Sequence, residues 1–201
     1  MSGVFGTNLP TKTNSFRPLL EVLEDRCVPA TVNTWSAADA IGTWNTAANW
    51  SLGHVPTSSE IATFDASSTA FCIIDAPAMG TNTVSGINMT ATYAAGITDT
   101  ADLTIGADGF VGGVFAVSGS ATILVAGDWS ESVSGGFIGG AGTVNFNSAS
   151  SQTIHDVNSA FTNLTHSGAG TLNLTAGMTP MTIGGDFING GGANAHGPPS
   201  L

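Results

Sequence analysis

The chain has 201 residues, of which 42% are hydrophobic and only 8% are charged, whereas soluble domains carry about 25% charged residues on average. Its three basic residues, Lys12, Arg17 and Arg26, are balanced by three acids within residues 1–26, so the rest of the chain carries the whole formal charge of −11. Without lysine or arginine, that body cannot neutralise phosphates. This excludes nucleic-acid binding through phosphate contacts and attraction to an anionic membrane surface.

Residues 1–30 form the first segment of the chain. Residues 1–15 are polar and contain glycine, which predicts disorder. In FRPLLEVLEDRCVPA, residues 16–30, the apolar residues between Leu19 and Leu23 fit one face of a short helix that ends before Pro29. Acidic residues interrupt the position where the apolar core of a signal peptide would lie. No apolar run approaches the roughly 20 residues of a membrane span, so we expect no membrane insertion.

The same stretch resembles the N-terminal leader of many large secreted and cell-surface bacterial proteins. That leader has the pattern R-P-x-L-E-x-L-E-D-R-x-x-P-A and precedes repetitive β-rich sequence. The resemblance implies an extracellular or cell-surface location and a sorting-like role for residues 1–30. The matching positions are Arg17, Pro18, Glu21, Leu23, Glu24, Asp25, Arg26, Pro29 and Ala30.

Residues 31–60 are rich in tryptophan, with Trp35, Trp44 and Trp50 all preceding the repetitive part of the chain. One interpretation is a cap, because the first coil of a repeat protein exposes its core and must be covered. The other is a glycan-binding platform, because an exposed indole offers a flat apolar face with a polar edge. We predict a Trp-rich N-terminal cap and keep the glycan platform at these three residues as the alternative.

Short alternating segments separated by glycine follow from residue 61 to residue 190. In TVNFN, Val144 and Phe146 would point to one side and the polar residues to the other, which is the period of a β-strand. In FTNLT the apolar anchors Phe161 and Leu164 are three residues apart instead of two. Strand-like segments begin near residues 102, 114, 121, 143, 152, 161, 171 and 181.

Two architectures use strands of this length, a β-sandwich and a parallel β-solenoid. The turns here are mostly Gly-Gly, Gly-Ala or Ser-rich, whereas a sandwich favours Asn-Gly or Asp-Gly hairpins. Similar Gly-Asp-aromatic units at Asp128-Trp129 and Asp186-Phe187 suggest stacked repeats in which both rings pack alike. We therefore predict an all-β, right-handed parallel β-helix over residues 61–190, with coils of roughly 20–30 residues, and a flexible tail at 191–201. The β-sandwich is the alternative.

Residues 142–190 also resemble the repeats of bacterial adhesin-like and autotransporter-passenger-like surface proteins. The resemblance rests on TVNFN followed by QTI, on FTNL followed by GTLNL, and on TIGGDF. The tryptophan-rich TWNTAANWSLGHVP resembles the segment that often begins such regions. The likeness implies a structural or adhesin-like role and suggests that the chain is a fragment of a longer protein.

Candidate catalytic and metal-binding residues are few. Asp99, Asp102 and Asp108 are close in sequence and could supply paired carboxylates, but aspartates among Thr and Gly more often stabilise turns. His155 and His166 could lie on one face and bind a metal together with Asp156. The other histidines, His54 and His196, suggest no site, and the sequence has no G-x-S-x-G motif. We therefore predict that the chain is not an enzyme.

No dedicated cofactor site is expected. The sequence has many oxygen ligands, but it lacks the G-G-x-G-x-D repeat and the D-x-D-x-D-G loop of calcium-binding proteins. We expect at most weak Ca²⁺ binding at the surface. Of the two cysteines, Cys27 and Cys72, the second is expected to be a buried apolar residue. The partners that fit these expectations are an extracellular glycan or another surface protein.

Overall fold

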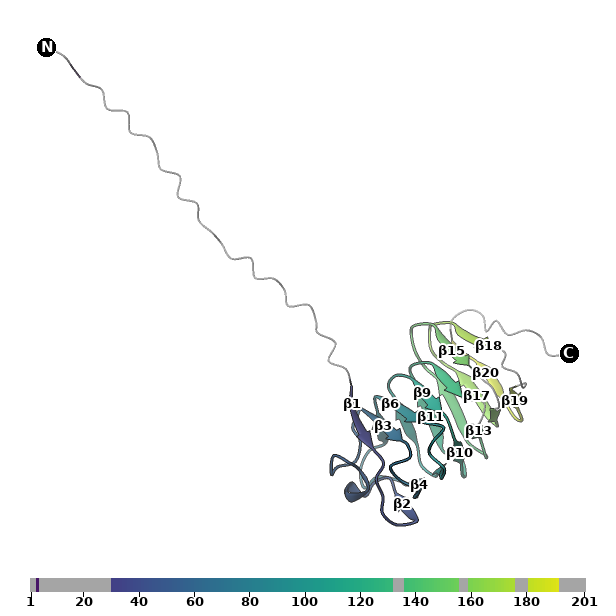
Figure 1. Ribbon diagram of the computed structural model, residues 1–201. Helices are drawn as coiled ribbons and strands as arrows, with labels where there is room; N and C mark the ends of the chain where they lie inside the picture. The colour runs from purple at the N-terminus through teal and green to yellow at the C-terminus, as the bar shows by residue number, and fades with distance from the viewer. Residues whose placement is uncertain (1–2, 4–29, 132–135, 156–158, 176–180, 192–201) are drawn as a thin grey trace.

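The computed structural model describes residue 3 and residues 30–131, 136–155, 159–175 and 181–191. In this part of the chain the protein is an all-β parallel solenoid, as predicted, and the strands stack in chain order from β1 to β20 (Figure 1). The β-sandwich alternative is wrong, because every pairing between named strands is parallel. The expected helix and leader within residues 16–29, and the tail beyond Gly191, lie outside the described residues.

Three parallel sheets form the walls of the solenoid, and the chain visits them in turn. Sheet one contains β1 (Thr31–Thr34), β3 (Glu60–Phe64), β6 (Gly86–Met89), β9 (Gly109–Val111), β12 (Trp129–Glu131), β15 (Gln152–His155) and β18 (Leu172–Thr175). Sheet two contains β2 (Ile41–Thr43), β4 (Phe71–Ile74), β7 (Gly96–Asp99), β10 (Val114–Val117), β13 (Gly136–Ile138), β16 (Ala160–Phe161) and β19 (Thr182–Ile183). Sheet three contains β5 (Asn82–Val84), β8 (Leu103–Ile105), β11 (Thr122–Val125), β14 (Thr143–Phe146), β17 (Asn163–His166) and β20 (Phe187–Asn189).

The register of the sheets gives the length of a coil. Gly109 pairs with Trp129, 20 residues further along the chain, whereas Thr31 pairs with Glu60 after 29 residues. The predicted range of coil lengths is therefore confirmed. The longest coil is the first, because it includes the tryptophan-rich loop that leaves the wall of the solenoid.

The core is built from inward-facing side chains that stack in columns along the solenoid. Ile105, Val125 and Phe146 lie in register on adjacent strands of sheet three, and all three are fully buried. The alternation predicted for TVNFN is also confirmed, since Val144 and Phe146 are buried and Asn145 is only half-buried. Full burial of such a side chain contributes about 1.5–3 kcal/mol to folding, so these columns stabilise the stack.

The three-residue spacing in FTNLT marks a corner between two sheets. Phe161 ends β16 in sheet two and Leu164 lies in β17 in sheet three, and both side chains are buried. A single strand would have placed them on opposite sides, whereas the turn at the corner lets both point inward. The predicted strand over this stretch is therefore two strands.

The repeated Gly-Asp-aromatic unit does not return to the same wall. Trp129 begins β12 in sheet one and is fully buried, whereas Phe187 begins β20 in sheet three and is 44% exposed. Their separation of 58 residues is not a whole number of coils, so the expectation that both rings pack alike is wrong.

The tryptophan-rich range 31–60 forms both the first coil and a loop over it. It supplies β1 and β2, the outermost strands of two sheets, and a 3₁₀ helix, η1 (Ala47–Asn49). The boundary expected at residue 60 falls at the start of β3, since Glu60 is its first residue. Among the described residues, no helix is long and apolar enough to cross a bilayer.

Candidate functional site

The three tryptophans of the first coil form one buried aromatic cluster with Phe64. Trp50 lies between the other two, with ring centroids 5.1 Å from Trp35 and 4.8 Å from Trp44, and both contacts are edge-to-face. Phe64 packs beneath all three rings at 5.7–6.2 Å. The exposed fraction is 0% for Trp35 and Trp44 and 2% for Trp50. The cluster is therefore the aromatic layer that ends the core at the N-terminal side.

Polar contacts of the indoles fix the loop to the first coil. Trp35 donates its ring N–H to the carbonyl of Ala70 at 3.1 Å, and Trp50 donates to the carbonyl of Trp44 at 2.7 Å. The ring N–H of Trp44 is buried and has no partner. A glycan platform needs an exposed indole face, and none of these rings presents one in this conformation. Glycan binding at the three residues stays a prediction for binding measurements.

A groove of about 340 Å³ lies beside the cluster, where the first coil meets the loop between β4 and β5. Trp44 lies at this groove, but its surface is covered, so a sugar ring could stack on it only if the walls moved. The lining is uncharged, and hydroxyl and amide groups dominate it. The lining residues are Trp44, Asn45, Val55, Pro56, Thr57, Ser58, Pro77, Thr81, Asn82 and Thr83.

One wall of the groove is held rigid by a polar network. The side-chain N–H₂ group of Asn45 donates to the Asp75 carbonyl at 2.7 Å and to the side-chain oxygen of Asn82 at 3.2 Å. Asn82 donates to the same Asp75 carbonyl at 2.9 Å, and the Asn45 backbone N–H donates to the Asp75 carboxylate at 3.0 Å. These bonds join three segments that are distant in the sequence, so the wall is fixed before any ligand arrives.

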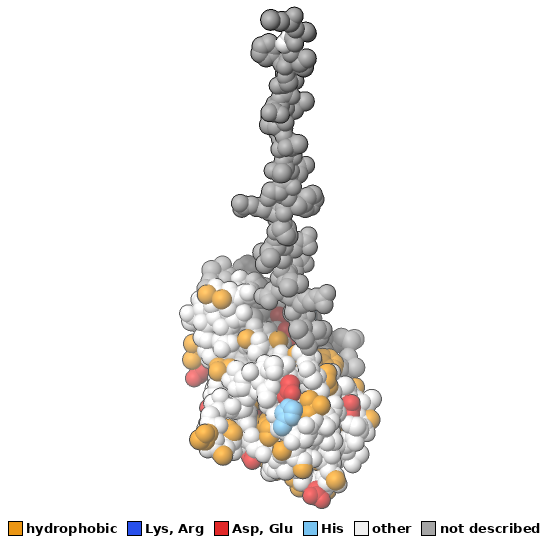
Figure 2. Space-filling model, turned by 90° about the vertical axis from the view of Figure 1, so that its left-hand side faces the viewer, with side chains coloured by type: hydrophobic (Ala, Val, Ile, Leu, Met, Phe, Trp, Pro, Cys, Tyr) orange, Lys and Arg blue, Asp and Glu red, His pale blue; other side chains and the backbone are white. Residues whose placement is uncertain are grey.

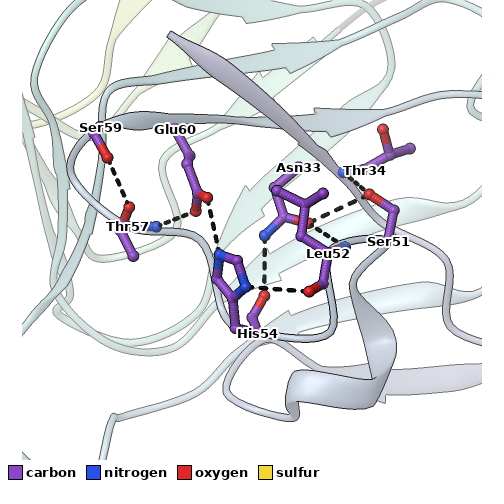
Figure 3. A network of polar contacts seen from close by, with 8 residues as sticks. All are labelled: Asn33, Thr34, Ser51, Leu52, His54, Thr57, Ser59 and Glu60. Carbon is purple, nitrogen blue, oxygen red and sulfur yellow. Dashed lines mark hydrogen bonds and ion pairs between the residues drawn. The ribbon is translucent and has the colours of Figure 1, made fainter.

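The opposite side of the loop is held by an ion pair between His54 and Glu60 (Figure 3). The ring Nε2 of His54 lies 2.8 Å from a carboxylate oxygen of Glu60, whose other oxygen accepts the backbone N–H of Thr57 at 2.9 Å. The hydrogen bond with Glu60 raises the pKa of His54. Burial raises the pKa of Glu60, but the bonds from His54 and Thr57 outweigh it and lower that pKa overall. This pair fastens the loop after the tryptophan cluster.

The side chain of Asn33 completes the same network (Figure 3). It is fully buried, donates to the carbonyl of His54 at 2.9 Å and accepts the backbone N–H of Leu52 at 3.2 Å. The network therefore ties β1 to the loop that covers it.

The three candidate carboxylates do not come together as a catalytic pair. Asp99 points into the core, whereas Asp102 and Asp108 are exposed. Asp102 accepts the backbone N–H of Thr122 at 2.8 Å, and Asp108 accepts that of Asp128 at 2.9 Å. Asp128 in turn accepts the backbone N–H of Thr153 at 2.7 Å. The exposed carboxylates thus link one coil to the next.

Asp99 is the exception among the acids. One oxygen accepts the backbone N–H of Ala101 at 3.3 Å, and the other is buried with no partner. Burial raises the pKa of Asp99 to about 7. Cys72 is also fully buried, as predicted, and burial raises its thiol pKa well above the usual value. Neither group is accessible to a substrate in this conformation.

The two histidines proposed as metal ligands lie on different sheets. His155 ends β15 in sheet one, where Thr175 is 3.0 Å from its ring, and His166 ends β17 in sheet three. The His166 ring is fully buried, lies 3.0 Å from Asn189, and has an Nε2 without a partner. Asp156 and His196 lie outside the described residues. Within the described ranges, no three His, Cys, Asp or Glu side chains form a group that could hold a metal ion.

Sequence reasoning did not find the groove. Its lining comes from residues 44–45, 55–58 and 81–83 together with Pro77, which meet only because the loop folds back over the first coil. The one available signal was the pair of prolines, Pro56 and Pro77, which both mark loops in the sequence.

No protein-family model, curated protein or solved structure matches this chain.

Proposed function

We propose that this chain is a non-enzymatic structural segment of an exported, adhesin-like protein at the cell surface. The observation that carries the proposal is the axial series of turn carboxylates, in which Asp102, Asp108 and Asp128 each accept a backbone N–H of the following coil. Side chains used in this way hold a rod together and are not free for chemistry. The β-solenoid itself supports the same role, because stacked coils make an extended, regular body.

The surface of the described residues is also suited to a spacer. It consists mostly of uncharged polar groups and backbone, with scattered apolar side chains (Figure 2). Lysine and arginine occur only at positions 12, 17 and 26, so this surface offers no cationic contact to phosphates. The export component of the proposal depends on the leader-like stretch before residue 30.

Fractionation of the cells that produce the protein tests this proposal. We expect the intact chain outside the cytoplasm, either released or at the cell surface. Recovery of the protein in the cytosolic fraction would contradict the export component. A protein with Arg17 and Arg26 both replaced by Ala provides the matched variant, because it alters the leader-like stretch and leaves the solenoid sequence unchanged.

A second candidate function is carbohydrate binding in the groove beside Trp44. The favouring observation is the uncharged lining of hydroxyl and amide groups around a volume of about 340 Å³. Neutral polyhydroxylated ligands are recognised by groups of this kind. The binding would act through the rim, because the indole surface is covered.

A glycan array followed by titration calorimetry tests this candidate, with Thr83→Ala as the variant in the groove. Thr104→Ala is the matched control, because Thr104 lies in register with Thr83 on the next strand and does not line the groove. Binding that Thr83→Ala weakens and Thr104→Ala does not would support a groove site. The absence of any array signal would rule it out.

A further inference from the structure

The last described coil of the solenoid is open. Its strands β18, β19 and β20 are the terminal strands of the three sheets, and among the described residues each pairs on one side only. The unpaired backbone groups of such strands are a template for another strand.

The core is also uncovered at this end. Leu174, Ile183 and Phe187 occupy core columns, but Leu174 and Ile183 are only half-buried and Phe187 is 44% exposed. The residues beneath them in register are Ile154, Phe161 and Leu164, and their exposed fractions are 0%, 2% and 0%. The difference arises because no described coil lies above the last one.

The charge distribution favours a neutral, strand-forming partner at this end. Described residues 30–131 contain nine acids, whereas described residues 136–191 contain only Asp186. A basic partner would find little attraction here. A second copy of the chain, although acidic overall, would meet little like-charge repulsion if it approached with this end.

The opposite end of a second copy cannot serve as the partner surface. There the loop covers the outer edge of β1, since Ser51 and Thr34 exchange bonds and the Ser36 N–H donates to the Asn49 carbonyl. A head-to-tail contact is therefore blocked, and only the open end of one copy is complementary to the open end of another.

We propose that the open coil formed by β18, β19 and β20 is an interface with a second copy of this chain, in a closed tail-to-tail dimer. A two-fold axis perpendicular to the stack brings the same three edges together and reverses the strand direction, so the strands of the two copies pair antiparallel. Such an isologous contact buries both exposed core ends at once and stops at two subunits.

Sedimentation velocity of the full chain over a wide concentration range tests the dimer. We expect the mass to rise from 20.1 kDa to twice that value and then to remain constant. A chain that stays monomeric at every concentration would overturn the proposal. Growth beyond two subunits would also overturn it, because it would require a second interface at the covered end.

The matched variants are Ile183→Asp in β19 and Ile138→Asp in β13. Both strands belong to sheet two, but Ile183 lies at the open end and Ile138 is 51% exposed on the lateral wall. The first variant should raise the dimer dissociation constant at least about tenfold, because the two-fold axis sets the new carboxylates against each other. The second should leave the dissociation constant unchanged. An equal effect of both variants would contradict the assigned interface.

Hydrogen exchange keeps the test decisive if Ile183→Asp fails to fold. In the wild-type chain, the amides of β18, β19 and β20 should exchange more slowly at concentrations where the mass has doubled. The amides of β1 and β2 should exchange at the same rate at all concentrations. Protection that appears at β1 instead would place the contact at the other end and overturn the proposal.

Discussion

The two ends of this solenoid solve the same physical problem in different ways. Both ends of a stack expose core side chains and a row of unpaired backbone groups. At the N-terminal end, Trp35, Trp44 and Trp50 cover Phe64, and the loop supplies hydrogen-bond partners to the edge of β1. At the C-terminal end, Ile183 and Phe187 lie on the last described coil with nothing described above them.

The difference teaches that closing a coil takes two kinds of group at once. Aromatic side chains provide the area that shields the core, and polar side chains satisfy the strand edge. Asn33 serves the second purpose, because it bonds to two backbone groups of the covering loop. Phe187 provides area alone, so it leaves the edge of β20 unsatisfied among the described residues. This contrast leads to four predictions, from the largest expected effect to the smallest.

Truncation of a ring should affect the closed end far more than the open end. Trp50→Ala should lower the free energy of unfolding by about 3–5 kcal/mol, as is usual for a fully buried large ring. Phe187→Ala should lower it by less than about 2 kcal/mol, because nearly half of its side chain is already exposed to water. Urea unfolding followed by circular dichroism measures both, at concentrations where the chain is monomeric. Equal losses would mean that the open coil is covered in solution.

The stability of the closed half should depend on pH through Asp99. Its pKa in the folded state, about 7, is above the ordinary value of 3.8. Between these values the folded protein holds a proton that the unfolded chain releases, so this stabilisation is present below about pH 4 and is lost as the pH rises through 7. The loss is at most about 4 kcal/mol.

Asp99→Asn tests this pH dependence, since an amide of the same shape carries no charge. We expect the variant to be more stable than the wild type at about pH 8 and to lose that advantage at about pH 4. Asp102→Asn is the control, because Asp102 is exposed and an amide oxygen can still accept the N–H of Thr122. Parallel stability curves for wild type and Asp99→Asn would show that the carboxyl is not buried in solution.

A methyl group added at Gly42 should disturb the closed end. A Cβ at this position would lie 2.9 Å from the Trp35 ring and 2.8 Å from the Asn49 side chain, closer than such contacts occur. Gly42→Ala should therefore lower the free energy of unfolding by about 1–3 kcal/mol. Gly190→Ala at the open end has no atom within 4 Å of the added group and should change it by less than about 0.5 kcal/mol. Thermal unfolding of both variants makes the comparison, and a neutral Gly42→Ala would contradict tight packing of the loop.

The sequence was sufficient to predict the repeated part of the fold. Alternation at Val144 and Phe146 identifies both a strand and its inward side, because the side-chain period of a strand is two residues. The spacing of strand starts gives the coil length, since each coil must return to the same wall. Cys72 was predictable as a buried residue from its apolar neighbours alone.

The assignment of residues to walls was not predictable in the same way. Trp129 and Phe187 have the same local sequence but belong to different sheets, because coil lengths vary from 20 to 29 residues and shift the phase. His155 and His166 were separated for the same reason. The groove was hidden because its lining depends on how a loop of the first coil folds back, which local periodicity does not encode.

The smallest expected effect concerns the ion pair of His54 and Glu60 at the closed end. The pKa of His54 is raised from the ordinary 6.5, so its stabilising contribution is complete below that value and is lost as the pH rises through the raised pKa. Since His54 is 50% exposed, solvent screens the pair and the effect on stability is small. His54→Gln should flatten the pH dependence of the thermal midpoint across this range. His155→Gln is the matched control, because the ring of His155 contacts the hydroxyl of Thr175 and no carboxylate in a printed contact of this sheet. If His155→Gln flattens the curve as much as His54→Gln does, the pH dependence does not arise from the contact that fastens the covering loop.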